Sequence, residues 1–346
     1  MKKVMNLFVK RQEIFTLLII FVYFFSISAV NQDFFQIDTL IRILFNGTML
    51  FVMTMGISAV IITKNIDVSI GSLMGLAATI GGTVLNQTGN AFLGIGAALL
   101  VGLAGGIFNG IGVAYLGVTA IIMTLGTMAI FRGLLIMFTG GKWIQNVPSF
   151  FTDFSKVRFL GIQGSIWIVV IVLIVLWLFF SKTTKGRYFY AVGNNNEGAR
   201  MQGINVKLIT VSAFAVSGLM AGLAGVLYVA QIGAVPNLAG NGMETQAIAA
   251  AVIGGVSLTG GSGNYLGALL GAILLQTINY SLVYLKVPGY WNNAISGFLL
   301  LAIIVVASLI QKYMKREREK NLDKQIREEF FKTQQNMDNA YTEGDA

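Results

Sequence analysis

Residues 14–30 read IFTLLIIFVYFFSISAV, a run without a charged side chain. A basic N-terminal segment precedes this run and contains Lys2, Lys3, Lys10 and Arg11. A secretory signal peptide begins in a similar way and ends at a small-residue cleavage site. No clear cleavage site follows Val30 and many more apolar segments do, so we interpret residues 14–30 as a first membrane span that the mature protein keeps.

The composition of the whole chain is typical of a membrane protein. Hydrophobic residues make up 55% of the 346 residues, charged residues make up 11%, and the mean hydropathy is +0.73. Soluble domains carry about 25% charged residues, so this chain has too few to cover a soluble surface. The 41 glycines suit a bundle in lipid, because small residues let membrane helices approach closely.

Ten apolar segments predict an all-α fold, a polytopic transmembrane helix bundle of about ten spans. A span needs about 20 residues, so the eighth segment is short and is expected to re-enter the membrane or to borrow flanking residues. The segments cover residues 14–30, 40–62, 68–85, 91–114, 119–138, 166–180, 208–229, 246–258, 265–284 and 293–311.

The positions of Lys and Arg predict the orientation, because cytoplasmic loops are rich in these residues. Four cations precede the first span, five lie in residues 181–207 and five more lie in residues 312–320. With ten spans the three clusters fall on one side, so both termini are expected in the cytoplasm. The loop 139–165 fits less well, because it places Lys142, Lys156 and Arg158 outside.

Three short motifs recur in the same order. Their second copies lie 173, 174 and 169 residues after the first: Ile80-Gly81-Gly82 and Ile253-Gly254-Gly255, Gly89-Asn90 and Gly263-Asn264, Tyr115-Leu116-Gly117-Val118 and Tyr284-Leu285-Lys286-Val287. The copies are five predicted spans apart, and an odd number inverts one copy relative to the other. We therefore predict an inverted repeat of residues 40–138 and 208–311, a construction used by transporters. A chance match between glycine-rich helices is the alternative.

The C-terminal segment 312–346 differs from the rest of the chain. It carries eight Lys and Arg and eight Asp and Glu side chains. Leu322, Ile326 and Phe330 are four residues apart, which gives a narrow apolar stripe on a helix. We predict a charged cytoplasmic tail, separate from a transmembrane domain of residues 1–311, with a helix that is either solvated or docked on a partner.

Catalytic side chains are scarce in this sequence. The absence of Cys and His excludes Cys nucleophiles, His general bases and zinc sites built on these ligands. The chain also lacks the G-x-x-x-x-G-K-[ST] motif, so it cannot hydrolyse ATP by a P-loop mechanism. We expect no catalytic residue, metal site or cofactor in this chain, and an energy source in another chain or an ion gradient.

Ion-coupled carriers bury ionisable groups that titrate or bind the ion. Candidates are few here: Arg42 begins the second segment, Arg132 lies inside the fifth, and Asp67 and Glu244 lie at segment ends. None forms an evident acidic relay, which argues against ion coupling, although backbone carbonyls can also bind sodium.

The loop between the sixth and seventh segments contains GRYFYAVGNNNEGARMQGIN at residues 186–205. Asn195 or Asn196 can cap a short helix with Glu197 in its first turn, and Gly203 can end it. A short capped helix is a compact element that another protein can push. The alternative is a basic loop that only sets the topology.

Four motifs in this order resemble the sugar-type permeases of bacterial ABC importers, the group of ribose, galactose, xylose and autoinducer-2 permeases. The resemblance extends over roughly residues 40–310. It rests on IDVSIGS at residues 66–72, on AYLGV and TLGTMAIFRG within residues 109–133, on the loop 186–205, and on ETQAIAAAVIGGVSLTGGSG at residues 244–263.

The chain departs from the family pattern at several points. Gly198 replaces a frequent Ala, which lowers the local helix propensity, and Asn65 replaces a frequent Gly. Gln246 replaces an acidic residue, which leaves the choice of substrate open. The tail after residue 312 is longer than the family requires.

The resemblance implies a permease subunit in the bacterial plasma membrane that translocates a monosaccharide. Its implied partners are a cytoplasmic ATPase subunit that binds ATP and Mg, a second permease chain that is identical or different, an extracytoplasmic sugar-binding protein, and membrane lipid. Nucleic acid is not expected, because the cations lie at segment ends. The residues implied to couple the loop to the ATPase are Gly193, Asn194, Glu197, Ala199, Arg200 and Gly203.

Polar side chains on the predicted spans are candidates for the substrate pathway, because they can replace the water that hydrates a sugar. Such side chains more often form hydrogen bonds between helices than contacts with a ligand, and we predict that Asp67 is the N-cap of the third helix, because Asp is strongly favoured there. The candidates are Asn46, Asp67, Ser69, Asn109, Thr124, Thr127, Glu244 and Asn279.

Two other functions stay open at this point. A permease of the same superfamily could import another small solute, such as a branched-chain amino acid or a nucleoside. An ion-coupled secondary carrier of similar topology would need an acidic pair inside the membrane that the sequence does not show.

Overall fold

The computed structural model describes residues 12–288 and residues 291, 294, 295, 297, 298, 301 and 305. The chain divides into two units, Met1–Phe298 and Leu299–Ala346, and the description below concerns the first. The predicted tail 312–346 and most of the predicted segment 293–311 lie outside the described residues.

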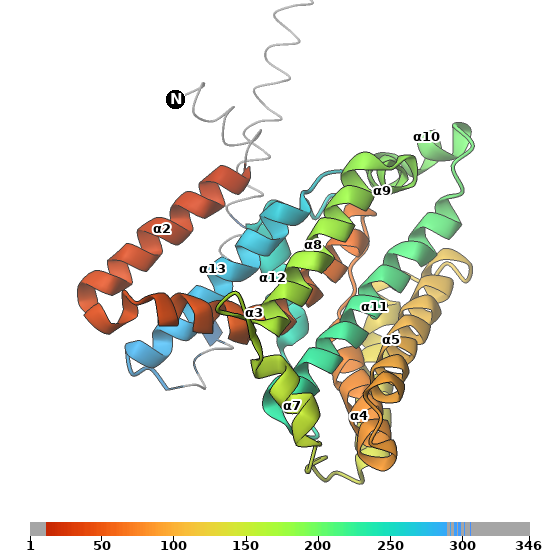
Figure 1. Ribbon diagram of the computed structural model, residues 1–346. Helices are drawn as coiled ribbons and strands as arrows, with labels where there is room; N and C mark the ends of the chain where they lie inside the picture. Colours follow the sequence, from red (N-terminus) through yellow and green to blue (C-terminus); the bar gives the residue numbers. More distant parts are fainter. Residues whose placement is uncertain are drawn as a thin grey trace, which may run out of the picture. The chain divides into compact units, whose positions relative to one another are not determined.

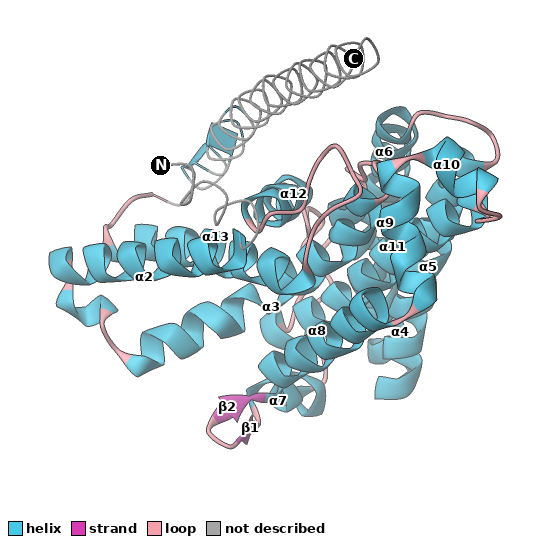
Figure 2. Cartoon of the chain, turned by 90° about the horizontal axis from the view of Figure 1, so that it is seen from above, coloured by secondary structure: helices cyan, strands magenta, loops and turns pink. Residues whose placement is uncertain are grey.

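Helices make up almost all of the regular structure (Figures 1 and 2), which confirms the predicted all-α bundle. The only strands in the described part form one short antiparallel hairpin, in which Phe159 pairs with Ile162. In chain order the elements are α2 (Gln12–Val30), η1 (Gln32–Phe34), α3 (Ile37–Ile62), α4 (Ile70–Thr88), α5 (Ala91–Ala114), α6 (Ala120–Thr139), α7 (Ser149–Lys156), β1 (Arg158–Phe159), β2 (Ile162–Gln163), α8 (Gly164–Lys182), α9 (Thr184–Asn194), α10 (Asn196–Met201), α11 (Val206–Ile232), α12 (Met243–Ile253) and α13 (Tyr265–Tyr284).

Within the described residues, six helices are long and apolar enough to cross a membrane: α3, α5, α6, α8, α11 and α13. Residues Thr16–Val30 of α2 and all of α12 are apolar but shorter. The first nine predicted segments each contain a helix, but this structure does not confirm the count of ten spans. The short eighth segment is the 11-residue helix α12, as its length suggested.

The contacts between helices show a repeated pattern, in which each of the two longest helices packs against a pair of helices from the other predicted copy. Helix α11 packs against α4 and α5, and α3 packs against α12 and α13 in the same way. The long helices α3 and α11 also contact each other at the centre. The repeated asparagines have the same local role, because the side chain of Asn90 accepts a hydrogen bond at the start of α5 and that of Asn264 does so at the start of α13. These correspondences support the internal repeat, while its inverted axis stays a prediction.

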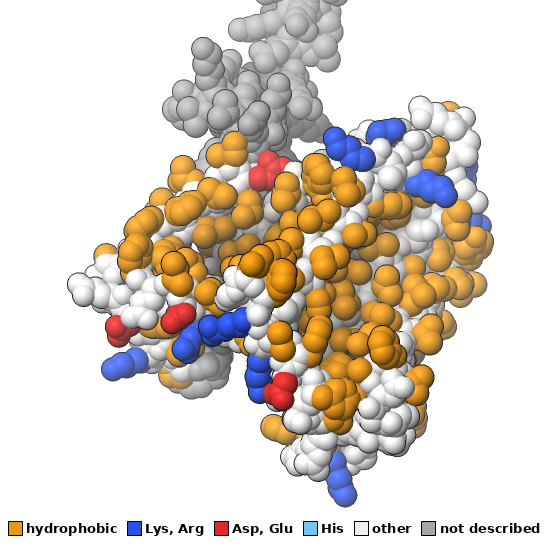
Figure 3. All heavy atoms as spheres, in the orientation of Figure 1, with side chains coloured by type: hydrophobic (Ala, Val, Ile, Leu, Met, Phe, Trp, Pro, Cys, Tyr) orange, Lys and Arg blue, Asp and Glu red, His pale blue; other side chains and the backbone are white. Residues whose placement is uncertain are grey.

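The burial of the helices follows this arrangement. Every residue of α3 from Gly47 to Ile62 is buried. By contrast, only 22% of the most apolar 18-residue stretch is buried in α6, and the same share is buried in α8. Hydrophobic side chains consequently cover most of the face seen in Figure 3, with many of the basic side chains toward its upper and lower ends. Such a surface matches a bundle that is surrounded by lipid.

Glycines let α5 and α11 approach closely. Gly102 and Gly106 on α5 face Gly218 and Gly222 on α11, and each pair has the spacing of a small-xxx-small motif. A Cβ atom on Gly218 would lie 2.8 Å from the Cα atom of Gly106. The contact between the two helices therefore involves their backbones, and neither can accept a larger residue without moving.

We expect Gly218→Val to destabilise the bundle, because the new side chain collides with the α5 backbone. Overpacking of this kind costs about 1–3 kcal/mol. Thermal unfolding of the purified protein in detergent should give a lower Tm for Gly218→Val. The matched control is Gly133→Val on α6, where a Cβ atom meets nothing within 4 Å. Equal Tm values for the two variants would contradict the close contact.

Candidate functional site

The segment that joins α3 to α4 leaves the helix in a tight turn. The Asn65 backbone N–H donates to the carbonyl of Val60 at 3.1 Å, and the Lys64 N–H donates to the carbonyl of Ile61 at 2.9 Å. This pair of bonds is a Schellman motif, in which the residue at the left-handed position is usually Gly. Here that residue is Lys64, with φ of 64°. The turn directs residues 65–69 back into the bundle.

Asp67 is the centre of a buried polar network. Its Oδ1 atom accepts from the backbone N–H of Ser69 at 2.9 Å and from the Ser69 hydroxyl at 2.6 Å. Its Oδ2 atom accepts from the hydroxyl of Ser217 on α11 at 3.0 Å. Asp67, Ser69 and Ser217 are each 0% exposed. A buried carboxylate needs such donors, because burial without them is very costly.

Two further helices hold the same segment. Asn109 on α5 donates from Nδ2 to the Ser69 hydroxyl oxygen at 2.8 Å. The Thr124 hydroxyl on α6 accepts from the backbone N–H of Val68 at 3.3 Å and donates to the carbonyl of Ile66 at 3.4 Å. We call Asp67, Ser69, Asn109, Thr124 and Ser217 the Asp67 network. It ties the α3–α4 segment to α5, α6 and α11.

The prediction that Asp67 is the N-cap of the third helix is wrong by two positions. Helix α4 begins at Ile70, and its N-cap position is occupied by Ser69, without a side-chain capping hydrogen bond. The Asp67 carboxylate accepts from Ser69 and Ser217, and within the described residues it makes no hydrogen bond to the N–H groups in the first turn of α4.

The predicted pathway residues Asp67, Ser69, Asn109 and Thr124 thus come together in the structure. Sequence reasoning missed Ser217, which lies 150 residues from Asp67 along the chain. It stands in a stretch of α11 rich in small residues, and no local signal links it to an aspartate.

A second polar cluster lies where α4 and α12 begin. Gly71 on α4 is so close to α12 that a Cβ atom there would collide with the Glu244 carboxylate, and it would also lie 3.1 Å from the Glu244 nitrogen. Glu244 Oε1 accepts from the backbone N–H of Gly242 at 3.1 Å. Arg132 on α6 donates from Nη1 to the carbonyl of Ala239 at 2.7 Å. The first turns of two helices therefore meet beside a carboxylate and a guanidinium.

The three remaining candidates lie apart from these clusters. Asn279 on α13 donates to Gln246 Oε1 on α12 at 3.4 Å. Thr127 donates to the carbonyl of Thr124 in its own helix at 3.3 Å, so its hydroxyl does not face a neighbour. Asn46 is exposed on α3.

Three of the candidates present a buried oxygen that has no hydrogen-bond partner in the part of the chain that the structure describes. These atoms are Asn109 Oδ1, Glu244 Oε2 and Asn279 Oδ1. Unpaired buried acceptors are costly, and each one needs an explanation. The three atoms belong to different helices, and each could accept a hydrogen bond from a hydroxyl group.

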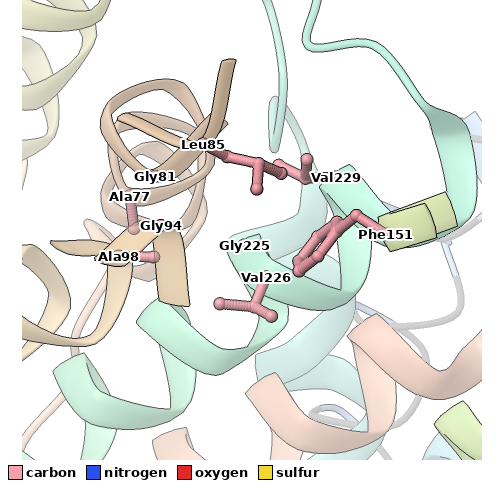
Figure 4. A pocket seen from close by; sticks show the side chains of 9 residues that line it. All are labelled: Ala77, Gly81, Leu85, Gly94, Ala98, Phe151, Gly225, Val226 and Val229. Carbon is pink, nitrogen blue, oxygen red and sulfur yellow. The ribbon is translucent and has the colours of Figure 1, made fainter. Parts of the chain in front are cut away.

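An apolar pocket lies where α4, α5, α7 and α11 meet (Figure 4). No side chain on its wall can form a hydrogen bond, so it does not fit a hydroxylated ligand. Its lining consists of Ala77, Gly81, Leu85, Gly94, Ala98, Phe151, Gly225, Val226 and Val229.

The loop after α8 folds into two short helices. The Thr183 hydroxyl caps α9 by accepting from the Gly186 N–H at 3.0 Å, and the Asn195 side chain caps α10 by accepting from the Gly198 N–H at 3.0 Å. Glu197 lies in the first turn of α10, and Gly203 follows the helix with φ of 78°. The predicted capped helix is therefore confirmed.

The residues predicted to couple this loop to a partner fall into two sets. Gly193 and Ala199 are buried, so they support the loop and cannot themselves contact a partner. The other four are exposed: Asn194, Glu197, Arg200 and Gly203. Sequence reasoning missed Met201, whose side chain is 88% exposed at the end of α10.

Gly193 lies where three segments of backbone meet. The Gly261 N–H donates to the carbonyl of Ile62 at 2.9 Å. A Cβ atom on Gly193 would collide with this carbonyl and would lie 2.6 Å from the Gly261 nitrogen. We call Ile62, Gly193 and Gly261 the glycine junction. It joins α9 to the last residue of α3, five residues before Asp67.

Aromatic side chains fix the rest of α9. The ring of Phe180 on α8 lies 4.9 Å from the ring of Phe189 and 4.5 Å from that of Tyr265 on α13. The Tyr190 hydroxyl donates to the carbonyl of Gly263 at 3.2 Å. Burial raises the pKa of Tyr190 to about 12, so this hydroxyl stays a donor at physiological pH. Helix α9 is consequently anchored to α8 and α13 and should move with them.

We expect the Asp67 network to behave as one energetic unit. Ser217→Ala removes one hydrogen bond to a carboxylate, and such bonds contribute about 1.5–3 kcal/mol. Asp67→Ala removes the acceptor for three donors and should destabilise the protein more. Unfolding of both single variants and the double variant should show a coupling free energy above about 0.5 kcal/mol. Strictly additive effects would contradict the network.

Comparison with known proteins places the chain in a family. A family model described as "Branched-chain amino acid transport system / permease component" matches residues 39–304. No solved structure matches the chain.

Several curated relatives have one name, the autoinducer 2 import system permease protein LsrC. The Photorhabdus luminescens protein is 40% identical to this chain, over 87% of this chain and 91% of its own. The Yersinia enterocolitica protein is 41% identical, over 84% of this chain and 80% of its own. The Escherichia coli K12 protein is 38% identical, over 88% of this chain and 89% of its own. These names confirm the resemblance to the permease group that includes autoinducer-2 permeases. The chain is a multi-pass membrane protein and a transport subunit, and it belongs to the permease family described as the branched-chain amino acid transport system / permease component.

Proposed function

We propose that this chain is the permease subunit of an ATP-driven ABC importer for a small hydroxylated solute of the sugar type. Autoinducer-2 is the first candidate for that solute. The observation that carries the proposal is the similarity to autoinducer-2 import permeases over most of both chains.

The partners follow from the class of system. A cytoplasmic ATPase subunit would bind ATP and Mg, an extracytoplasmic binding protein would deliver the solute, and a second permease chain would complete the pathway. The end of the bundle that carries α9 and α10 would face the cytoplasm, because the basic loop 181–207 lies there. Both termini are then cytoplasmic, in the plasma membrane of a bacterium.

The contacts of α9 suggest how ATP drives transport. Exposed Glu197, Arg200 and Met201 on α10 would dock into the ATPase subunit, and its movement would displace α9. The glycine junction leaves no space between α9 and the end of α3, so the displacement would reach residues 63–69. The Asp67 network binds that segment to α5, α6 and α11, so a displacement of the segment would carry these helices with it.

The polar groups in the bundle favour a hydroxylated solute. Asn109 Oδ1, Glu244 Oε2 and Asn279 Oδ1 are acceptors, and a hydroxylated solute offers several donors. A branched-chain amino acid is the second candidate, because the family description names it. Its carboxylate needs donors, and the guanidinium of Arg132 already interacts with the carboxylate of Glu244. A secondary carrier is the third candidate and would need no ATPase.

Uptake into proteoliposomes tests the proposed function. The vesicles contain this chain, the second permease chain and the ATPase subunit, the binding protein is added outside, and ATP is enclosed on the ATPase side. Labelled autoinducer-2, pentoses, hexoses, leucine and nucleosides are offered in turn. We expect ATP-dependent uptake of autoinducer-2 or one sugar, and its loss when Glu197 and Arg200 are both changed to Ala. The control is Lys142→Ala, an exposed cation between α6 and α7, which should transport normally.

Other results would overturn parts of the proposal. ATP-dependent uptake of leucine alone would show that the solute is an amino acid and not a sugar, while the chain would still be part of an ATP-driven importer. Uptake that persists without ATP and stops with an ionophore would show a secondary carrier.

The glycine junction gives a separate prediction. Gly193→Ala places a methyl group against the Ile62 carbonyl, so α9 can no longer seat correctly. The collision costs about 1–3 kcal/mol. A cost of about 1.4 kcal/mol lowers the ratio of correctly seated to displaced α9 tenfold. We expect the variant to assemble with the ATPase subunit but to transport roughly tenfold less solute per ATP hydrolysed. Gly198→Ala on α10, where the nearest atom to the new methyl group is 3.3 Å away, is the control. An unchanged ratio for Gly193→Ala would contradict the proposed coupling route.

A further inference from the structure

The segment from α7 to β2 presents an apolar surface that the transport proposal does not use. Five of its large hydrophobic side chains are more than half exposed; three lie in α7 or β1, one joins these two elements and one is in the turn of the hairpin. The exposed fractions are 51% for Phe150, 57% for Phe154, 59% for Val157, 63% for Phe159 and 77% for Leu160. We call these five residues the hairpin surface. Figure 2 shows the hairpin beside α7 and the start of α8.

The opposite side of α7 is fixed to the bundle. Phe151 is buried in the apolar pocket against α4 and α11 (Figure 4). The Ser155 hydroxyl donates to the carbonyl of Ala230 on α11 at 2.9 Å. With Phe151 and Ser155 inward, Phe150 and Phe154 point outward on the other face. The apolar surface is therefore held in a defined position and is not a loose loop.

The hairpin lies at the membrane boundary because of its connection to α8. Strand β2 ends at Gln163, and the membrane-spanning helix α8 begins at the next residue. Trp167, in the first turn of α8, donates to the carbonyl of Phe159 at 3.1 Å, and the two rings are 5.9 Å apart. Tryptophan is enriched at the boundary between hydrocarbon and headgroups. The hairpin thus lies within about one helical turn of that boundary.

The tip of the hairpin has an unusual residue for its conformation. Leu160 and Gly161 both have positive φ, 53° and 80°. A two-residue turn of this kind favours Asn or Asp before Gly, because a large side chain is strained there. Strained residues of this type cluster at functional sites. Packing within the described chain does not explain Leu160, because most of its side chain is exposed.

Cations flank the apolar residues. Arg158 is exposed on β1, and Lys156 is exposed at the end of α7. Lys156 pairs with Asp153 at 3.8 Å, but both side chains are about two-thirds exposed and such a pair contributes little. Positive charge beside exposed aromatic and aliphatic groups is the pattern of an element that lies in the interface of an anionic membrane. It also accounts for two of the three cations that fitted the orientation rule poorly, Lys156 and Arg158.

The exposed face of α8 continues from the hairpin. Ile171, Ile174 and Val175 are 59%, 49% and 57% exposed on a helix that crosses the membrane. This face of α8 would contact lipid chains, and the hairpin surface continues the same apolar surface to the depth of the lipid headgroups.

We propose that the hairpin surface is a lipid-binding site, in which the apolar side chains enter the interfacial layer and Lys156 and Arg158 bind anionic headgroups. The ligand is a phospholipid with a net negative charge, such as phosphatidylglycerol. The site anchors α7, which packs on α11, at a fixed depth. This proposal depends on the membrane topology and not on the identity of the solute.

The chain has no Cys, so a single cysteine can report on the site. Leu160→Cys in the full chain is labelled with a bimane fluorophore and placed in nanodiscs that contain brominated phosphatidylcholine as quencher. We expect strong quenching by the brominated lipid and weak quenching by iodide in the water. The matched control is Met201→Cys, which replaces an exposed apolar side chain on α10. Its label should be quenched strongly by iodide and only weakly by the brominated lipid.

A second arm tests the charge. Nanodiscs contain one-tenth brominated lipid, either phosphatidylglycerol or phosphatidylcholine, in the same mixed bilayer. We expect brominated phosphatidylglycerol to quench labelled Leu160→Cys at least twofold more than brominated phosphatidylcholine. Adding Lys156→Gln and Arg158→Gln should remove this excess and leave the quenching by phosphatidylcholine. Lys207→Gln, at the start of α11, is the control and should keep the excess.

Three results would overturn the proposal. Quenching of labelled Leu160→Cys by iodide and not by lipid would place the hairpin in water. Iodide quenching that disappears when the binding protein is added would assign the surface to that protein. Equal quenching by the two brominated lipids would leave an apolar anchor and exclude the anionic site.

Discussion

The bundle depends on how the chain satisfies its polar groups between α3 and α4. An interruption of a helix inside a membrane bundle leaves backbone donors and acceptors without water, and each must find a partner in the protein. Asp67 supplies acceptors for Ser69 and for Ser217, and Asn109 and Thr124 reach the same segment from α5 and α6. Because these partners come from separate helices, the segment both interrupts the helix and fixes how α4, α5, α6 and α11 meet.

Glycine has the complementary role, because it lets backbones touch where polar side chains cannot reach. Gly102, Gly106, Gly218 and Gly222 bring α5 and α11 into backbone contact, so this pair should move as one body. Gly193 brings the short helix α9 against the end of α3 in the same way. A push on α9 thus meets a rigid contact and not a compressible side chain. This connection makes a mechanical route from the surface of the protein to the Asp67 network physically reasonable.

The sequence predicted most of the helices, because apolar runs of span length have few alternative structures. It also predicted the capped helix after Asn195, because capping is a local interaction. It identified Asp67, Ser69, Asn109 and Thr124 as polar residues of interest but did not show that they meet. The sequence could not predict that Ser217 bonds Asp67 or that Gly193 contacts Ile62, because these partners are distant in the sequence. The position of Asp67 relative to α4 was misjudged, because Ser217 on another helix competes for its carboxylate.

We expect ATP-driven movement of α9 and α10 to reach residues 63–69 through the glycine junction. Hydrogen–deuterium exchange of the assembled importer can be measured with and without a non-hydrolysable ATP analogue. The analogue should change exchange in residues 60–69 and 257–263 together, while exchange in residues 144–163 stays the same. A change confined to residues 184–203, with residues 60–69 unaffected in an importer that transports, would show that the movement does not pass through the glycine junction.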